Sequence, residues 1–186
     1  MALLTLAEAK AQLDIQTTAD DVELLAYIES LTAVIENLVG PVEPRTVTET
    51  IHGNGSTTMV LGQRPVLSLT SLTPILSAGL PLDVAALALD PGTGELSRLD
   101  GRYFGGGPWT VTYQAGRADI PATINVAARI LLQHLWRTQY GASRALGGVG
   151  GGDDYSVNEP VPGWGYAVPN RVLQLLEPYK LPPAVA

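Results

Sequence analysis

The spacing of apolar residues changes twice along the chain, from helical to alternating and back to helical. Between residues 18 and 39, apolar side chains recur every three or four positions, as on one buried helix face. They are Leu24, Leu25, Ile28, Leu31, Ile35 and Leu38. Thr18 is a suitable helix start and Gly40-Pro41 a suitable end, so the pattern predicts an amphipathic helix here. Its polar face carries Glu23, Glu29, Thr32 and Glu36.

A shorter helix precedes it. Thr5 and Glu8 have the spacing of a capping box, in which each side chain binds the other residue's backbone N–H. This predicts a short helix that ends near Leu13.

The longest helical pattern covers residues 119–140. Asp119 and Pro121 favour its start, and Gly141 is a natural C-terminal residue. One face holds Ile124, Ala127, Ala128, Leu131 and Leu135, and Ile130, Leu132 and Trp136 widen it. Such a wide apolar surface is typical of a central helix, or of one that packs against a neighbouring subunit.

Residues 45–116 alternate between apolar and polar, as strands do. Segments 46–51 and 57–61 flank an Asn-Gly turn, which predicts a hairpin. Segment 64–73 also alternates, with Leu67, Leu69 and Leu72 expected to face inward. Further strands are expected near 85–89, 94–99 and 109–113. The region therefore reads as a small antiparallel sheet or barrel inserted between helices.

The C-terminal region changes composition. A Gly-rich run at 145–154 is followed by an extended segment and a short helix at 169–179 with proline at both ends. The helix is either the end of a docking arm or a helix that folds back on its own core. The predicted fold is α+β: a small helical bundle with an inserted antiparallel β region and an extended C-terminal arm. Its parts are N-terminal helices at 1–44, the β region at 45–116, a central helix at 117–144 and the arm at 145–186.

Charge is unevenly distributed over the 186 residues. Residues 1–50 hold nine acids against Lys10 and Arg45, which accounts for the whole net charge of −7. Such an acidic surface argues against tight wrapping of nucleic acid, which needs clustered Lys and Arg.

The chain lacks cysteine, which excludes disulfides and thiolate metal sites. Its first residues do not have the pattern of a signal peptide. The helix at 119–140 is too interrupted by Asn, Arg, Gln and His to span a membrane.

No motif predicts catalysis. The Gly-rich run at 147–152 follows no strand and has no phosphate-binding lysine. His52 and His134 fall in different elements, and Asp153-Asp154 offers too few oxygens for a cation. We therefore expect no enzyme activity, no metal and no cofactor.

The order of several short motifs resembles the head-to-tail connector (adaptor) proteins of tailed bacteriophages. The motifs comprise the segment 4–13, the helix that begins at Asp20-Asp21 and the strand 64–72. They continue with the strand end 111–116, the helix after Ile120-Pro121, and the ending Leu175-Leu176-Glu177-Pro178-Tyr179-Lys180. Together they cover most of residues 3–180, and the Gly-rich insert at 147–152 departs from the family pattern.

This resemblance implies a structural virion protein without catalytic activity. Copies would form a ring, a dodecamer, beneath the portal, extending the DNA channel and joining head to tail. Its partners would be the portal protein, the next neck or tail-completion protein, and DNA that passes without sequence-specific binding; no membrane is involved. It would be made in the host cytoplasm and lie in the neck of the virion.

Two sets of residues are candidates for these contacts. Since relatives reach the portal with their C-terminal segment, the portal-contact candidates are Trp164, Tyr166, Leu173, Leu176 and Tyr179. Truncation near residue 150 would then leave a folded core that no longer binds the portal. Acids that face a lumen would repel DNA phosphates and let DNA slide. The channel-lining candidates are Asp20, Asp21, Glu23, Glu29 and Glu36.

Two other functions remain as alternatives to the connector. One is a non-viral binding or assembly module that recognises a ligand with the hairpin at 46–61. The other is a small enzyme with a site not visible in the sequence.

Overall fold

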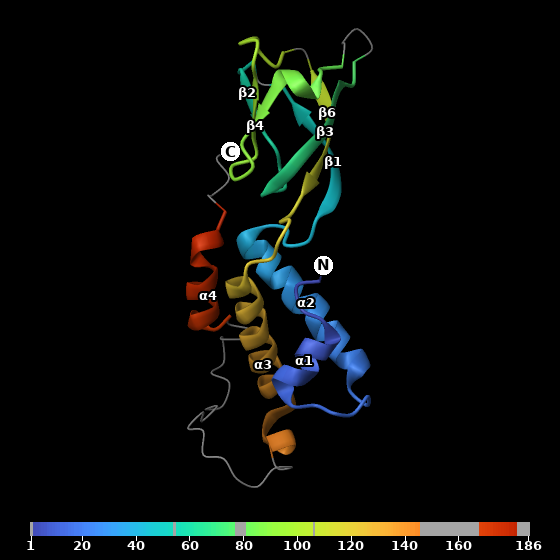
Figure 1. Ribbon diagram of the computed structural model, residues 1–186, viewed down its shortest axis with the longest axis vertical. Helices are drawn as coiled ribbons and strands as arrows, with labels where there is room; N and C mark the ends of the chain where they lie inside the picture. The colour runs from blue at the N-terminus through green and yellow to red at the C-terminus, as the bar shows by residue number, and fades with distance from the viewer. Residues whose placement is uncertain (1, 54, 77–80, 106, 146–167, 182–186) are drawn as a thin grey trace. The chain divides into compact units, whose positions relative to one another are not determined.

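The computed structural model describes residues 2–53, 55–76, 81–105, 107–145 and 168–181, with side chains omitted for 138–145. The chain divides into two compact units (Figure 1). The helical unit comprises Leu3–Ile35 and Pro121–Pro178, and the β unit comprises Met1–Ala2, Glu36–Ile120 and Tyr179–Ala186. Four α-helices and two antiparallel sheets confirm the α+β class over the described residues.

Helix α1 (Leu6–Leu13) begins at the predicted capping box. The Glu8 backbone N–H donates to Thr5 Oγ1 over 3.3 Å, and the Thr5 backbone N–H donates to Glu8 Oε2 over 2.9 Å. Two N–H groups that the helix itself leaves without partners are thereby satisfied.

Helix α2 (Asp21–Val39) begins three residues after the predicted start at Thr18 and ends as predicted at Gly40. Gly40 has φ +75°, which favours glycine at a helix end. Leu24, Leu31 and Ile35 are buried as the periodicity requires, whereas Leu25 is 52% exposed. The apolar stripe is therefore narrower than the sequence predicted.

Helix α3 (Ala122–Ala145) is the central helix. Ile124, Ala127, Ala128 and Leu131 are buried on the predicted face. The helix continues through Gly141, so the predicted end there is wrong. A glycine inside a helix costs only about 1 kcal/mol, and the alanines and arginine that follow are good helix formers.

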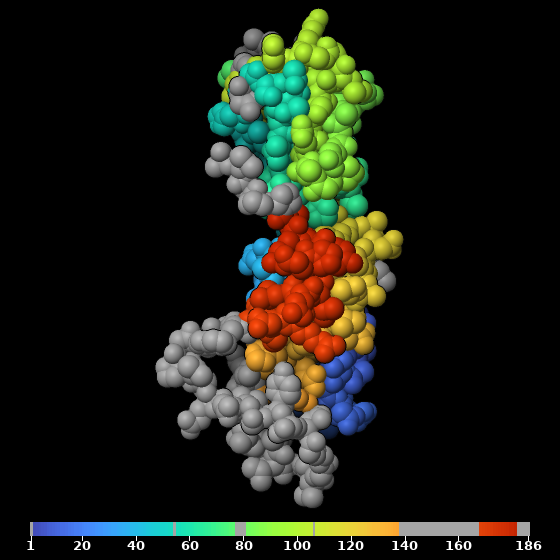
Figure 2. Space-filling model, turned by 90° about the vertical axis from the view of Figure 1, so that its left-hand side faces the viewer, coloured from blue at the N-terminus to red at the C-terminus, as the bar shows by residue number. Residues whose placement is uncertain are grey.

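Helix α4 (Asn170–Leu176) and the 3-10 turn η2 (Glu177–Tyr179) form the predicted C-terminal helix. Val172 and Leu176 of α4 are fully buried, and α4 packs against α3 (Figures 1 and 2). This helix therefore folds back on the helical unit. The Gly-rich run and the extended segment before it lie outside the described residues.

The β unit contains two three-stranded antiparallel sheets. One has the order β1-β6-β3 (Arg45–His52, Pro108–Ala115, Val66–Pro74), and the other β2-β5-β4 (Thr58–Val60, Glu95–Arg98, Leu87–Leu89). Buried residues from both sheets share one core, among them Met59, Leu72, Leu96, Val111 and Tyr113. Strands lie close to each predicted position, and the predicted antiparallel sheet or barrel takes the form of two three-stranded sheets.

The predicted hairpin between 46–51 and 57–61 is wrong. Strand β1 pairs with β6 and strand β2 with β5, so the Asn-Gly connection crosses from one sheet to the other. The Gly53 and Gly55 backbone N–H groups donate to the carbonyls of Gly107 and Phe104 instead of closing a hairpin ladder. A turn motif specifies a local bend, but the pairing depends on distant strands: β1 pairs with residues more than fifty positions away, and β2 with residues more than thirty positions away.

The inward position predicted for Leu67 is also wrong. Its side chain is 39% exposed, while Leu72 is buried and Leu69 packs against the core. The register of β3 against β6 shifts between Val66 and Ser68, and again between Leu69 and Ser71. Each shift inserts an extra residue and interrupts the simple alternation.

Candidate functional site

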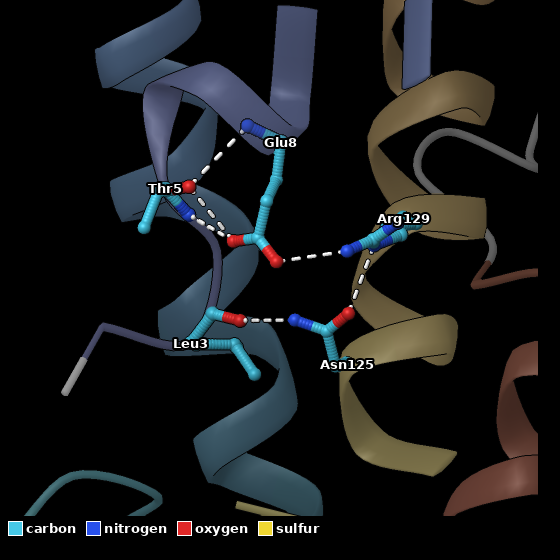
Figure 3. Close-up of polar contacts among 5 residues, drawn as sticks. All are labelled: Leu3, Thr5, Glu8, Asn125 and Arg129. Carbon is cyan, nitrogen blue, oxygen red and sulfur yellow. Dashed lines mark hydrogen bonds and ion pairs between the residues drawn. The ribbon is translucent and has the colours of Figure 1, made fainter. Parts of the chain in front are cut away.

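A polar network fixes the N-terminal segment to α3 inside the helical unit (Figure 3). Arg129 Nη2 donates to Glu8 Oε1 over 2.8 Å, and Arg129 Nε donates to Asn125 Oδ1 over 2.8 Å. Asn125 Nδ2 in turn donates to the Leu3 carbonyl over 2.8 Å. One turn of α3 thus holds both the start of α1 and the backbone before it.

The charge of Glu8 is stabilised within this network. Its pKa lies below the ordinary value of 4.5, first because the Thr5 backbone N–H donates to the carboxylate, then because the Thr5 hydroxyl does. The hydrogen bond and charge of Arg129 lower it further. Glu8 therefore stays ionised at lower pH in the folded chain than in the unfolded chain.

Two of the five acids proposed to line a channel form ion pairs within the chain. Asp21 Oδ1 lies 2.7 Å from Lys10 Nζ, and Glu36 Oε2 lies 2.8 Å from Arg45 Nη1. Glu36 also accepts from the Val42 backbone N–H over 2.9 Å. These pairs reduce the negative field that the two carboxylates project into solvent.

The other three candidate acids differ in exposure. Asp20 and Glu23 are half-buried beside the start of α2, whereas Glu29 is exposed on the solvent side of that helix. The structure therefore does not gather all five acids into one exposed cluster.

The predicted portal-contact residues also separate into groups. Leu176 is fully buried, while Leu173 and Tyr179 are half-buried. Leu173 lines an open hollow of about 430 Å³ with Asn170, Gln174 and Glu177. Helix α4 forms the red surface in the centre of Figure 2, beside α3. Trp164 and Tyr166 lie outside the described residues.

Tyr179 contacts an arginine that organises the end of α2. Arg117 donates from Nη1 and Nη2 to the Val39 carbonyl, over 3.2 and 3.1 Å, and from Nη1 to the Pro41 carbonyl over 3.3 Å. Its guanidinium lies 5.8 Å from the centre of the Tyr179 ring. Burial lowers the pKa of Arg117, and its interaction with the nearby Tyr179 opposes that shift. The C-terminal segment is thus held within the β unit by a cation–π contact.

The described residues show no grouping suited to a metal. His52 is exposed in β1 and His134 half-buried in α3, and no set of three potential ligands gathers in the described ranges. Among the helices described, none has the length and apolarity needed to cross a membrane.

Comparison with known proteins identifies the family. The profile of the family described as "Head completion protein" matches residues 2–181, and therefore both units. The chain belongs to the head completion protein family. This confirms the resemblance to phage connector proteins that the sequence motifs indicated.

The fold of this head completion protein also occurs in a solved structure described as "Neck of empty GTA particle computed with C6 symmetry", in which GTA is a gene transfer agent. The TM-score is 0.64, the identity is 21%, and the match covers 98% of this chain and 92% of that chain. Comparison with curated proteins finds no match.

Sequence reasoning missed the N-terminal network of this head completion protein. Leu3 and Leu4 are each 1% exposed, although they precede the first helix. A signal was present in α3, where Asn125 and Arg129 stand one turn apart on a largely apolar helix. Two polar residues at that spacing share a helix side, but the sequence does not identify their partner.

Proposed function

We propose that copies of this chain form a ring beneath the portal of a tailed-phage-like particle. The ring extends the DNA channel and joins the head to the tail, so that the chain has a structural role in the neck, between head and tail. The family match over residues 2–181 carries this proposal. Support comes from the fold of the neck structure, whose sixfold symmetry is compatible with six or twelve copies in a ring; we propose twelve.

The C-terminal segment is our candidate portal contact. Leu173 is partly exposed beside the hollow on α4, which gives a partner side chain a place to insert. Tyr179 is partly exposed as well, and aromatic residues commonly dominate the energetics of interfaces. Trp164 and Tyr166 belong to the same proposal on sequence grounds.

The acidic first fifty residues suit a channel through which DNA slides. Acids repel the phosphates and prevent tight binding, whereas a basic lining would hold the DNA. Asp21 and Glu36 contribute least, because Lys10 and Arg45 neutralise them.

Tail joining provides the test. DNA-filled, portal-bearing heads made without this chain are mixed with purified chain and then with tails. We expect tailed particles only after the chain is added, counted in electron micrographs. Heads that join tails equally well without it would overturn the proposed function.

A further inference from the structure

The solvent side of α2 is unusually poor in charge. The exposed positions on this side are Val22, Leu25, Ala26, Glu29, Ser30, Ala33 and Asn37. Val22 is 84% exposed and Leu25 52%, and Glu29 is the only charged member. A solvated helix face normally carries several charges, so this composition favours contact with another protein surface. We call Val22, Leu25, Ala26, Glu29 and Ala33 the α2 outer face.

A second face of the same kind lies on α3. Ala122, Val126, Ile130 and Arg137 follow one side of that helix and form the α3 outer face. Val126 is 45% exposed, Ile130 is half-buried, and Arg137 is exposed with no ion pair to a described residue. Gln133, which is half-buried and accepts from Gln12, lies on the same side. Arg137 is the one charge among the exposed members of this face, whereas Glu29 is the one charge among the exposed members of the α2 outer face.

Each of the two faces points away from the buried side of its own helix. Glu29 lies across α2 from the buried residues Leu24 and Leu31, and Arg137 lies across α3 from the buried Ile124 and Ala128. Since each face points away from its own helix's buried side, one copy can offer both faces at once. A ring requires such an arrangement, because each subunit contacts its two neighbours through different surfaces.

The two charges also lie at similar levels along the helices. Tyr27 of α2 and Trp136 of α3 meet edge to face, with ring centres 5.8 Å apart. Glu29 is two residues from Tyr27, and Arg137 is one residue from Trp136. With a rise of about 1.5 Å per residue, each charge is within about 3 Å of that contact along its helix.

We propose that the α2 outer face of one copy packs against the α3 outer face of the next, with Glu29 paired to Arg137. The occupant of each face is therefore a second copy of this chain, and the inference rests on the proposed ring. In a flat ring, neighbouring copies are related by rotation without a shift along the axis. When that axis runs along the helices, the levels of the two charges differ by only about 4.5 Å, which the long side chains of Glu29 in one copy and Arg137 in its neighbour can span.

This assignment changes the role of one predicted channel residue. Glu29 lies in the contact between copies, whereas a channel acid would face the DNA. Apolar burial of Val22, Leu25 and Val126 supplies affinity, and the charge pair specifies which face meets which. The same pair disfavours contact between two α2 outer faces, because two glutamates would then oppose each other.

Charge reversal tests the pair on assembled particles. Portal-bearing heads are sedimented with wild-type chain, Glu29→Arg, Arg137→Glu or the double variant, and the bound chain is quantified. We expect each single variant to bind at least about tenfold more weakly, since every contact in the ring carries the change. The double variant should recover most of the loss, because it restores an opposite pair.

A matched variant controls for net charge. Arg102→Glu makes the same charge change as Arg137→Glu at an exposed position of the β unit and should bind as wild type does. Single variants that bind normally, or a double variant that binds no better than the singles, would overturn the pairing. If wild-type chain adds no ring to the heads, the proposed function fails as well.

Cross-linking distinguishes this contact from a symmetric one. The natural chain has no cysteine, so Glu29→Cys and Arg137→Cys each introduce a single thiol. With a short bismaleimide, head-bound mixtures of the two variants should yield dimers, whereas either variant alone should not. Dimers from one variant alone would indicate contact between identical faces and overturn the proposal, as would a head-bound mixture without dimers.

Discussion

Individual polar residues determine how the chain enters its first helix. Glu8 accepts from Thr5 through one carboxylate oxygen and from Arg129 through the other, so α1 and α3 share a single carboxylate. The Arg129–Glu8 pair is about one third exposed on both sides, and such pairs contribute little by Coulomb attraction alone. Its main effect is positional, because Arg129 also orients Asn125, which binds the Leu3 carbonyl.

The lowered pKa of Glu8 predicts an acid-sensitive start of α1. A carboxylate with a depressed pKa in the folded state stabilises the fold fully above its ordinary value of 4.5, and this contribution is lost as pH falls through the folded value. Glu8→Gln should therefore reduce the free energy of unfolding at pH 7, and below about pH 4.5 this free energy should vary less with pH than it does in the wild type. Urea unfolding of both proteins between pH 3 and pH 7 measures the difference. Parallel pH curves for wild type and variant would contradict the account.

A second prediction at the scale of one residue concerns the stability of the chain when Gly40 is replaced. Its φ is +75°, and an added Cβ would overlap the Arg64 carbonyl oxygen, which is backbone and cannot rotate away. Gly101 has a similar φ of +68°, but open space surrounds the Cβ position. Gly101→Ala should cost about 1–2 kcal/mol from the left-handed conformation alone. Gly40→Ala should cost clearly more in the free energy of unfolding, and equal losses would show that no clash occurs.

At the scale of elements, α4 has two sides with different roles. Val172 and Leu176 are buried against the helical unit, while Leu173 is partly exposed and lines the hollow. Deleting everything after residue 150 would remove buried side chains from the core. The truncation suggested by the sequence would therefore confound loss of stability with loss of portal binding.

Point variants in α4 separate the two effects. Leu176→Ala should destabilise the chain by about 2–5 kcal/mol, because it leaves a cavity in the core. Leu173→Ala should cost about 1 kcal/mol or less and should reduce portal binding, because it removes a half-exposed contact. Urea unfolding and sedimentation with portal-bearing heads measure the two quantities. If Leu173→Ala binds normally, α4 is not the portal contact.

The helices could be predicted from the sequence more fully than the sheets. The capping box at Thr5 and the end of α2 at Gly40 depend on residues close in sequence, so local chemistry suffices. The strands lie near their predicted positions, but their pairing depends on distant partners. The β1–β6 pair joins Arg45 to Ala115, and neither the Asn-Gly turn nor the alternation of β3 carries that information.

At the scale of the whole molecule, the order of the motifs along the sequence indicated the family. The surfaces proposed for contact between copies could not be identified from the sequence. Leu25 fitted the apolar stripe of α2 in the sequence but is 52% exposed in the structure. Periodicity cannot distinguish an apolar side chain in the core from one that awaits a partner copy. The acids of residues 1–50 similarly suggested one continuous acidic surface. In the structure, however, Asp21 is paired with Lys10 and Glu36 with Arg45.

The central claim is that copies of this chain assemble as a ring beneath the portal. The most direct measurement is electron cryomicroscopy of portal-bearing, DNA-filled heads before and after addition of the purified chain. The account predicts a symmetric ring of added density below the portal, with the helical unit of each copy contacting its two neighbours. Heads without added density, under conditions where other head-completion proteins bind, would contradict it.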